Sequence, residues 1–553
     1  MVVHIAQVVA LVRVSRRGFA YPRITHPRVL LFPAHKSRAG TPRISLALFL
    51  IGLCLTSTSF GQELQGTPQR EELFQISPVM EDILTLSSPH FQGRQAGTPG
   101  GEQAANYVAQ RFHALGLHPP PATDKRENGS QWRQQSSVTA TLVLSPAHLA
   151  FFPLGLSTIH SPLLANAGKD FLPIFDSPSV NLTAPMIFVG YGIVDPARGV
   201  HDYQGVDVRN RIVMALRGKP PTYGPWITQE EKAQTAQDHG AAGFITLTGP
   251  ILTQYESRKG LGQTPMAIYS TGPEDRPIPG VWLDGKLGED LFRSIGLSLQ
   301  DMQMARNEQQ ATPPQTLPLI AHLQWTSQSV PGTLTNVLGV LPGQDTGGQD
   351  ALIIIGAHRD HFGAQAGLQF PGADDNASGT AVMLELARIL SQRRTPRTHT
   401  IVFVSFDGEE RGLLGSTLYV NNPAFPLKRT VAMINLDHVG IGNGKLTVGV
   451  TRMDKALAQR AGDQAGLGEQ VQIYGYFPGG DHVPFYEAGV PTITVVSSGT
   501  HPHFHQPSDT SDTIQPEILE TTGRYLFSLI SLLADHPQPA GHPEPTTKDL
   551  SQG

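Results

Sequence analysis

The stretch that decides the fold reads ALIIIGAHRD and covers residues 351–360. Five apolar residues stand together at its start, and a histidine and an aspartate follow them. An unbroken apolar run of this length is typical of a strand that is buried on both faces. The same pattern recurs at residues 400–406, 431–436 and 492–496. Four such strands predict a sheet that is covered on both sides.

Residues 380–390 lie between the first two of these strands and have the spacing of an amphipathic helix. A second helix is expected over residues 102–115, where apolar residues recur at intervals of three and four. Strands that alternate with helices indicate an α/β fold. We therefore expect a mainly parallel central sheet flanked by helices.

Potential metal ligands follow the predicted strands, at the edge where open α/β sheets place their binding sites. A loop at residues 371–376, PGADDN, adds two carboxylates just before the helix. Taken alone, each of these residues has an ordinary interpretation as polar surface or as a helix cap. Their joint placement makes them one candidate site, which comprises His358, Asp360, Asp374, Asp375, Glu409, Glu410, Asp437 and His505.

The mixture of imidazoles and carboxylates indicates the metal. Histidine nitrogen together with carboxylate oxygen suits zinc or a similar divalent ion, whereas calcium prefers oxygen alone. Five ligands are too many for one catalytic zinc and suit two ions that share a carboxylate and a water. Asp360 stands two residues after His358 and can fix the tautomer of its ring. Glu409 and Glu410 are adjacent, so one can bind metal while the other acts as a base, but their spacing does not decide which.

Six motifs around these residues resemble the zinc aminopeptidases of the bacterial leucyl-aminopeptidase type, a family of co-catalytic di-zinc metallopeptidases. Three motifs carry most of the likeness: GAHRD at 356–360, PGADDNASG at 371–379 and DGEERGLLGS at 407–416. The other three are NLD at 435–437, GDHVPF at 480–485 and FHQPSDT at 504–510. Upstream, Gly93-Arg94 and residues 97–100 are similar to the family's N-terminal segment.

The resemblance implies two zinc ions that are bridged by Asp375. His358 and Asp437 would complete one metal site, and Glu410 and His505 would complete the other. Glu409 would be the general base that activates the metal-bridging water.

The resemblance also assigns the neighbouring residues. Asp360 would support His358 from behind, and Asp374 would be structural. Asp481 and His482 would lie on the substrate side. A cis peptide bond would follow Asp375, as is common in the family. Arg359 departs from the tyrosine or leucine that the family more often has, which affects the expected substrate specificity.

The remaining sequence divides into segments of different character. Residues 62–140 are expected to be the N-terminal part of the catalytic domain, and residues 331–535 its metal-binding part. Residues 141–330 form an inserted β-rich domain and linker, in which residues 202–245 resemble a protease-associated domain. Because no cluster of ligands occurs there, we expect the insertion to modulate access rather than chemistry. Residues 536–553, rich in proline and polar residues, are expected to be a disordered tail.

The first 61 residues are interpreted as a signal or targeting segment. Eight arginines and lysines and no acidic residue precede Glu63, and residues 44–55 form an apolar run too short to span a membrane comfortably. This pattern predicts export to the periplasm or secretion; an uncleaved anchor and an organelle transit sequence remain alternatives. Membrane contact is expected only if the leader is retained. Cys54, the only cysteine, lies inside this segment.

The function predicted from these observations is that of an exported di-zinc exopeptidase, and specifically of an aminopeptidase that acts on peptides with a free N-terminus. A carboxypeptidase of the same fold, a glutaminyl-cyclase-like transferase and an inactive receptor-like protein are the alternatives. Arg359 and a protease-associated domain also occur in the carboxypeptidase branch. A net charge of -5 argues against a nucleic-acid partner. The oligomeric state is left open.

Overall fold

The computed structural model describes residues 73–121, 131–154, 162–253, 256–257, 262–269, 278–308, 310, 313–344, 351–393 and 397–535. The expected targeting segment, residues 1–61, and the expected tail, residues 536–553, lie outside the described residues. The ligand region comprises residues 73–121 and 331–535, and the inserted region comprises residues 162–310.

The four predicted strands form the centre of the ligand region. They are β11 (Leu352–His358), β14 (Thr400–Phe406), β15 (Thr430–Leu436) and β18 (Thr492–Ser497). β11 runs parallel to both β14 and β15, and β15 runs parallel to β18. The prediction of a mainly parallel central sheet is therefore confirmed. At the edge, β16 (Leu446–Thr451) is antiparallel to β18, and β17 (Val471–Tyr474) is parallel to β16.

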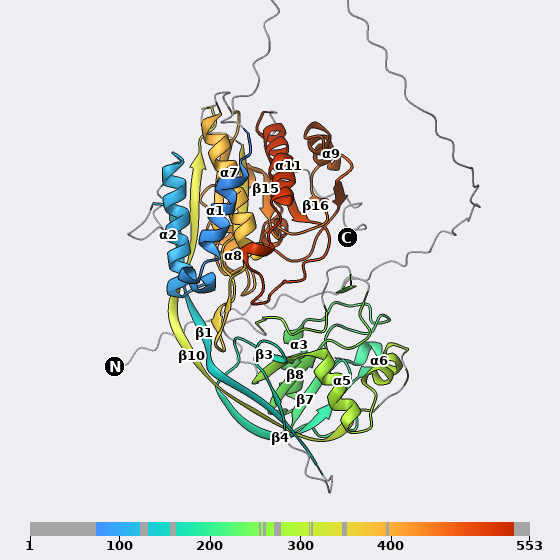
Figure 1. Ribbon diagram of the computed structural model, residues 1–553. Coiled ribbons are helices and arrows are strands. Elements are labelled where there is room, and N and C mark those ends of the chain that lie inside the picture. The colour runs from blue at the N-terminus through green and yellow to red at the C-terminus, as the bar shows by residue number, and fades with distance from the viewer. Residues whose placement is uncertain are drawn as a thin grey trace, which may run out of the picture. The chain divides into compact units, whose positions relative to one another are not determined.

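Both faces of this sheet are buried, because successive side chains of a strand point to opposite faces. Ile353 and Ile355 belong to the larger core, which the helices on one face complete (Figure 1). Leu352 and Ile354 belong to a smaller core with Tyr419. The helices of this region are α1 (Ile76–Leu86), α2 (Pro99–Ala114), α7 (Gly379–Gln392), α8 (Leu414–Asn421), α9 (Lys455–Gln464), α10 (His482–Glu487) and α11 (Pro516–Asp535).

The inserted region repeats this design on a smaller scale. Its strands β4 (Val180–Phe188), β7 (Ile212–Leu216), β8 (Gly243–Leu247) and β9 (Gly280–Leu283) are parallel neighbours. It also contains the helices α3 (Gln229–Asp238), α5 (Gly285–Ser294) and α6 (Leu299–Asn307). It is thus an α/β unit rather than simply β-rich. Short strands complete it: β2 (Leu163–Ala165), β3 (Phe171–Pro173), β5 (Val194–Asp195) and β6 (Val200–His201).

Two long antiparallel strands connect the regions (Figure 1). They are β1 (Arg133–Pro153) and β10 (Gln315–Leu341). β10 pairs with β14 through residues 337–341 and with β4 through residues 315–325. The expected domain limits at residues 141 and 330 therefore fall inside these strands. The linker was expected at residues 309–318, but β10 already begins at residue 315.

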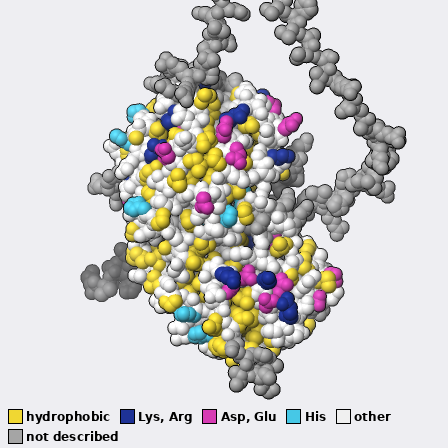
Figure 2. Space-filling model, viewed as in Figure 1, with side chains coloured by type: hydrophobic (Ala, Val, Ile, Leu, Met, Phe, Trp, Pro, Cys, Tyr) yellow, Lys and Arg dark blue, Asp and Glu magenta, His cyan; other side chains and the backbone are white. Residues whose placement is uncertain are grey.

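The remaining features concern the loops and the surface. A hairpin of β12 (Gly363–Gln365) and β13 (Leu368–Phe370) follows β11. On the face seen in Figure 2, acidic and basic side chains are interspersed. In the described part of the chain, we find no helix whose length and apolar character would let it cross a bilayer.

Candidate metal centre

The five predicted ligands meet at the carboxyl ends of the parallel strands. His358 Nε2 lies 3.4 Å from Asp375 Oδ1 and 3.2 Å from Asp437 Oδ1. His505 Nε2 lies 3.1 Å from Asp375 Oδ2 and 3.4 Å from Glu410 Oε2. Asp375 thus presents one oxygen to each histidine. This is the arrangement that a carboxylate bridging two cations requires.

Asp375 also shows that these residues suit a metal. Its side chain is only 2% exposed, and neither carboxylate oxygen has a hydrogen-bond partner among the described residues. A buried carboxylate is costly unless a cation or hydrogen-bond donors compensate its charge. The surrounding donors are imidazole nitrogens and carboxylate oxygens, the set that zinc binds. Two divalent cations fit this site.

The ionisation of the site without cations reflects the same crowding. Burial raises the pKa of Glu409 well above its usual value, and the negative charges of Asp437 and Asp481 add to the shift. Burial likewise raises the pKa of Glu410, and Asp375 adds to it. His358 is buried, which opposes its protonation, but the charges of Glu409 and Asp437 still raise its pKa well above the usual value. Protons therefore occupy the site in the absence of cations, and cations would displace them.

Asp360 supports two of the strand ends at once. Its backbone carbonyl lies 3.2 Å from His358 Nδ1, whereas its carboxylate Oδ1 is 3.7 Å from that nitrogen. The carboxylate instead accepts hydrogen bonds from the backbone N–H groups of Glu409 and Glu410, at 3.1 and 3.4 Å. The ring is therefore oriented by the carbonyl of Asp360, while its side chain fixes the loop after β14.

The loop that carries Asp375 is held by a second aspartate, which sequence reasoning did not single out. Asp509 accepts hydrogen bonds from the N–H groups of Asp374 and Asp375, at 2.9 and 3.0 Å. The side chain of Asp374 contacts His501 Nδ1 at 2.6 Å and the N–H of Gly440 at 2.8 Å. Asp374 is thus committed to protein partners. Asp509 lies within the motif at 504–510, which was the only available signal.

Three further observations concern neighbours of the ligands. The peptide bond between Asp375 and Asn376 is cis, as the resemblance implies. His438, also missed from the sequence, places Nε2 3.5 Å from Asp375 Oδ2 and 3.6 Å from Asp437 Oδ1. His361 Nδ1 lies 2.7 Å from Glu410 Oε1 and can fix that carboxylate.

Arg94 connects the N-terminal segment to two of the ligand loops. Its guanidinium is fully buried and donates to the backbone carbonyls of Leu86, Arg359, Pro371 and Gly372. Burial lowers its pKa to about 10, which leaves it charged at neutral pH. One side chain therefore satisfies four carbonyls around the site.

A pocket of about 220 Å³ opens onto the candidate ligands. Phe477, Gly479 and Gly480 form part of its wall. Asp481 and His482, expected on the substrate side, are buried behind this wall, and His482 Nε2 is 2.8 Å from the carbonyl of Phe477. Burial raises the pKa of Asp481 to about 7 and lowers that of His482. They support the wall and do not line the pocket.

Arg359 does not face this pocket either. Its side chain is fully buried, and Nη2 lies 3.2 Å from Asp407 Oδ2. Nη1 donates to the carbonyls of Ser405 and Phe406, at 3.1 and 3.2 Å. Among the described residues, the pocket is lined by histidines, carboxylates and apolar groups, with no arginine or lysine.

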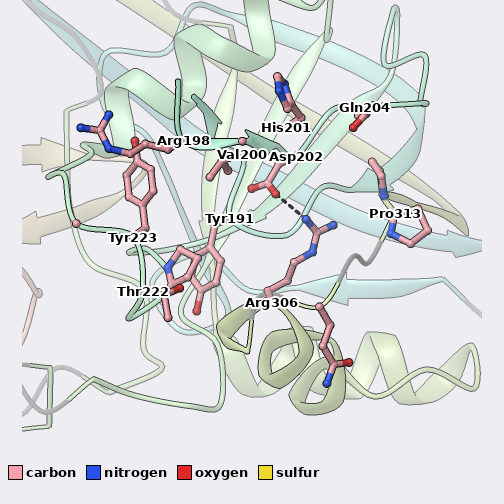
Figure 3. Close-up of a pocket in the computed structure, with 15 residues that line it drawn as sticks. Tyr191, Arg198, Val200, His201, Asp202, Gln204, Thr222, Tyr223, Arg306 and Pro313 are labelled. Carbon is pink, nitrogen blue, oxygen red and sulfur yellow. Dashed lines mark hydrogen bonds and ion pairs between the residues drawn. The ribbon is translucent and has the colours of Figure 1, made fainter. Parts of the chain in front are cut away.

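A larger cavity lies elsewhere and is lined mainly by residues of the inserted region (Figure 3). It has a volume of about 710 Å³, and Asp202 pairs with Arg306 at 2.6 Å in its wall. Every group of three potential metal ligands found among the described residues lies in the ligand region. Size alone therefore does not mark the site, and the chemistry resides in the smaller pocket.

Comparison with known proteins agrees with this placement. Residues 336–530, which contain all five candidate ligands and Glu409, match the model for peptidase family M28. This segment of the chain is therefore similar to peptidase family M28. Among similar proteins, aminopeptidase YwaD of Bacillus subtilis strain 168 is 28% identical over 378 residues, which cover 65% of this chain and 70% of that protein.

Two further proteins show the range of the likeness. The probable glutamate carboxypeptidase VP8 of Zea mays is 25% identical over 485 residues, which cover 80% of this chain and 64% of that protein. A solved zinc aminopeptidase from Bacillus subtilis shares the fold, with a TM-score of 0.57 and 23% identity. That match covers 86% of this chain and 98% of the solved chain, so it extends beyond the M28 segment.

Proposed function

We propose that this chain is a di-zinc aminopeptidase that removes the N-terminal residue of peptides. One observation carries the proposal: Asp375 is buried, its oxygens accept no hydrogen bond from described residues, and it is shared between two histidine-containing clusters. The names of its relatives support it, since aminopeptidases are found among both the curated and the solved matches.

His358, Asp375 and Asp437 would hold one zinc ion, and Asp375, Glu410 and His505 would hold the other. When bound, the zinc ions would polarise the scissile carbonyl and increase the acidity of the attacking water. Glu409 would accept the proton from that water and deliver it to the leaving amine. Asp360 holds the backbone of Glu409, so that the base is fixed by the same residue that orients His358.

The pocket favours a substrate with a free amine. Asp375, Glu410 and Asp437 are assigned to zinc, so the free α-amine of a substrate would contact one of the zinc ions, and the described lining offers no lysine or arginine that would pair with a substrate carboxylate. Its volume of about 220 Å³ is below the 300–1,000 Å³ that is usual for ligand pockets, which suits a single terminal residue better than a long peptide.

A carboxypeptidase is the second candidate, because relatives include a probable glutamate carboxypeptidase. Recognition of a substrate carboxylate requires a cationic donor, most often arginine. Arg359 pairs with Asp407 in the core and does not line the pocket. The aminopeptidase is therefore the better supported reading.

A panel of short peptides tests the proposal. Each sequence is supplied free, N-acetylated and C-amidated, with and without a zinc chelator. We expect cleavage of the free and amidated forms, none of the acetylated form, and loss of activity with the chelator. Cleavage that needs a free C-terminus would instead identify a carboxypeptidase.

Substitution of the base tests the mechanism. Glu409→Ala should reduce turnover by about 10²–10⁴-fold, the usual contribution of a general base, while two zinc ions remain bound per chain. Metal content is measured by atomic emission after dialysis. Full activity in this variant would reject Glu409 as the base.

We also propose that the inserted region is a protease-associated domain and that the chain is exported, to the periplasm or the medium. Residues 202–245 and the basic N-terminal leader support these two statements respectively. N-terminal sequencing of the mature protein tests the second. A mature chain that retains residues 1–61 in the cytoplasm would contradict it.

A further inference from the structure

The inserted region contacts a candidate zinc ligand directly. The contact is made by the inserted loop, residues 262–269. The N–H of Ala267 donates to the carbonyl of His505 at 2.9 Å, and His505 Nδ1 lies 3.0 Å from the carbonyl of Ala267. These two bonds join residues that are 238 positions apart. The sequence led us to expect that the insertion modulates access only, and this contact goes further.

The bond to Nδ1 determines how His505 can act. A ring that donates its Nδ1 proton to a carbonyl has its Nε2 lone pair free for a metal. That Nε2 faces Asp375 and Glu410. His358 is arranged in the same way, but its carbonyl belongs to Asp360 in its own loop. Each ligand histidine thus has a carbonyl behind it, and only that of His505 comes from the inserted region.

Packing holds the inserted loop against this histidine. Phe504, the neighbour of His505, packs with Met266 and Trp282 of the inserted region. Tyr269 stacks on Phe362 at 5.3 Å between ring centroids. Phe362 in turn contacts the His505 ring at 4.6 Å. The two hydrogen bonds are therefore part of a packed interface.

The backbone of His505 has a conformation that needs such support. Its φ is +55°, in the left-handed region that residues other than glycine rarely adopt. The bond between the N–H of Ala267 and the carbonyl of His505 holds this backbone in place. Both the ring and the main chain of His505 are thereby fixed by one residue of the insertion.

We propose that the inserted loop is a structural part of one zinc site and positions His505 through Ala267. This inference rests on the proposed di-zinc function. The two zinc sites would then differ in the parts of the chain on which they depend. The zinc at His358 and Asp437 depends on the ligand region alone, whereas the zinc at Glu410 and His505 also depends on the insertion.

Zinc titration of the full chain tests the inference. Ala267→Pro removes the N–H that holds His505, and Thr264→Pro places the same ring in the same loop at an exposed residue whose N–H makes no hydrogen bond with described residues. We expect Ala267→Pro to bind one zinc as the wild type does and the second about 10–100-fold more weakly, the usual effect of losing a supporting contact. Thr264→Pro should bind both normally. His505→Ala identifies which binding step belongs to this site.

A second variant keeps the test decisive if Ala267→Pro does not fold. Met266→Ala loosens the packing of the loop on Phe504 and leaves all backbone groups in place. It should weaken the same binding step as His505→Ala and spare the other. Second-step affinity within twofold of the wild type, or equal weakening of both steps, would overturn the inference. A wild-type chain that binds fewer than two zinc ions would instead overturn the proposed function.

Discussion

The ligand region and the inserted region have the same architecture but treat buried charge in opposite ways. Each has parallel strands with helices packed against them. In the inserted region, Asp202 pairs with Arg306 at 2.6 Å and Glu256 with Arg217 at 2.7 Å. In the ligand region, the oxygens of Asp375 find no donor. The inserted region compensates these charges with protein groups, whereas the carboxylate of Asp375 in the ligand region is left for cations.

Lys232 and Asp375 illustrate how the two regions differ in the partners that they provide for a buried charged group. Lys232 is as buried as Asp375, but its ammonium donates to the carbonyls of Leu216 and Gly218. The comparison teaches that burial of a charged group does not by itself mark a site. A buried charge that accepts no hydrogen bond from the described residues, as at Asp375, does.

The most severe test of this comparison exchanges a charge in each region. Asp375→Asn should lower zinc affinity by more than about 100-fold, because even contacts behind a ligand contribute 10–100-fold. Peptide hydrolysis should fall with it. Asp202→Asn should leave zinc content unchanged and lower the free energy of unfolding by about 1–3 kcal/mol, since it leaves the half-buried Arg306 without its charged partner. Zinc analysis and denaturant unfolding of both variants would separate the two roles; normal zinc binding by Asp375→Asn would contradict the assignment.

Arg94 offers a test of structural charge within the ligand region itself. Arg94→Met leaves four buried carbonyls without their donor and should lower the free energy of unfolding by about 3–5 kcal/mol. Arg460→Met, at an exposed residue of α9, should change it by less than about 0.5 kcal/mol. Urea denaturation measures both. Equal stability of the two variants would show that the carbonyls find other partners.

Zinc itself should act unequally on the two regions. At a free concentration about 100-fold above the dissociation constant, a bound ion stabilises a fold by about 2.7 kcal/mol. Hydrogen exchange should therefore slow in the loops after β11, β14 and β15 and in the inserted loop. β7 and β8 should change little. Equal slowing of hydrogen exchange in both regions would contradict the prediction that zinc stabilises mainly the ligand region and the inserted loop.

The smallest effect is expected from pH and concerns Lys232. Burial lowers its pKa to about 7, against about 10.4 in an unfolded chain. Between these values the unfolded state binds the extra proton, so this lysine makes the free energy of unfolding rise as pH increases from about 7 to 10. Lys232→Met should lack this rise and, at pH 9, be about 1–3 kcal/mol less stable, because two carbonyls lose their donor.

Denaturation at pH 6 and pH 9 measures the effect of Lys232. The exposed Lys286 provides the control, because Lys286→Met should retain the pH dependence of the wild type. A stability gap between Lys232→Met and the wild type that narrows as pH rises would contradict the sign of this prediction.

The sequence was most informative where burial is continuous. Residues 400–406 were predicted as a strand and form β14 with those limits. All seven side chains are buried, as expected for a short apolar run in a strand that is covered on both faces. The strands β1 and β10 were missed. Their burial alternates irregularly along 21 and 27 residues, and each finds its partner far away in the sequence.

The candidate site likewise contains residues that the sequence indicated and contacts that it did not. Most candidate ligands could be proposed from the sequence because they follow strand ends, and strand ends of one sheet meet in space. Asp375 lies instead in the loop before α7, and only the resemblance chose it over Asp374. The supporting contacts could not, since Asp509 with Asp375 and Ala267 with His505 join distant segments through backbone groups. A backbone carbonyl leaves no signature in a residue pattern. The role of the insertion was therefore underestimated.

The strand β10 limits how the inserted region can be deleted or exchanged between related proteins. One end of β10 pairs with β14 and the other end pairs with β4. The inserted region therefore cannot be deleted without disrupting a strand of the ligand region. Excision at residues 141 and 330 would cut both long strands and leave unpaired backbone N–H and C=O groups at a sheet edge, which promotes aggregation. Exchange of this module between relatives would succeed only with crossovers nearer residues 133 and 337, where the pair enters the ligand region.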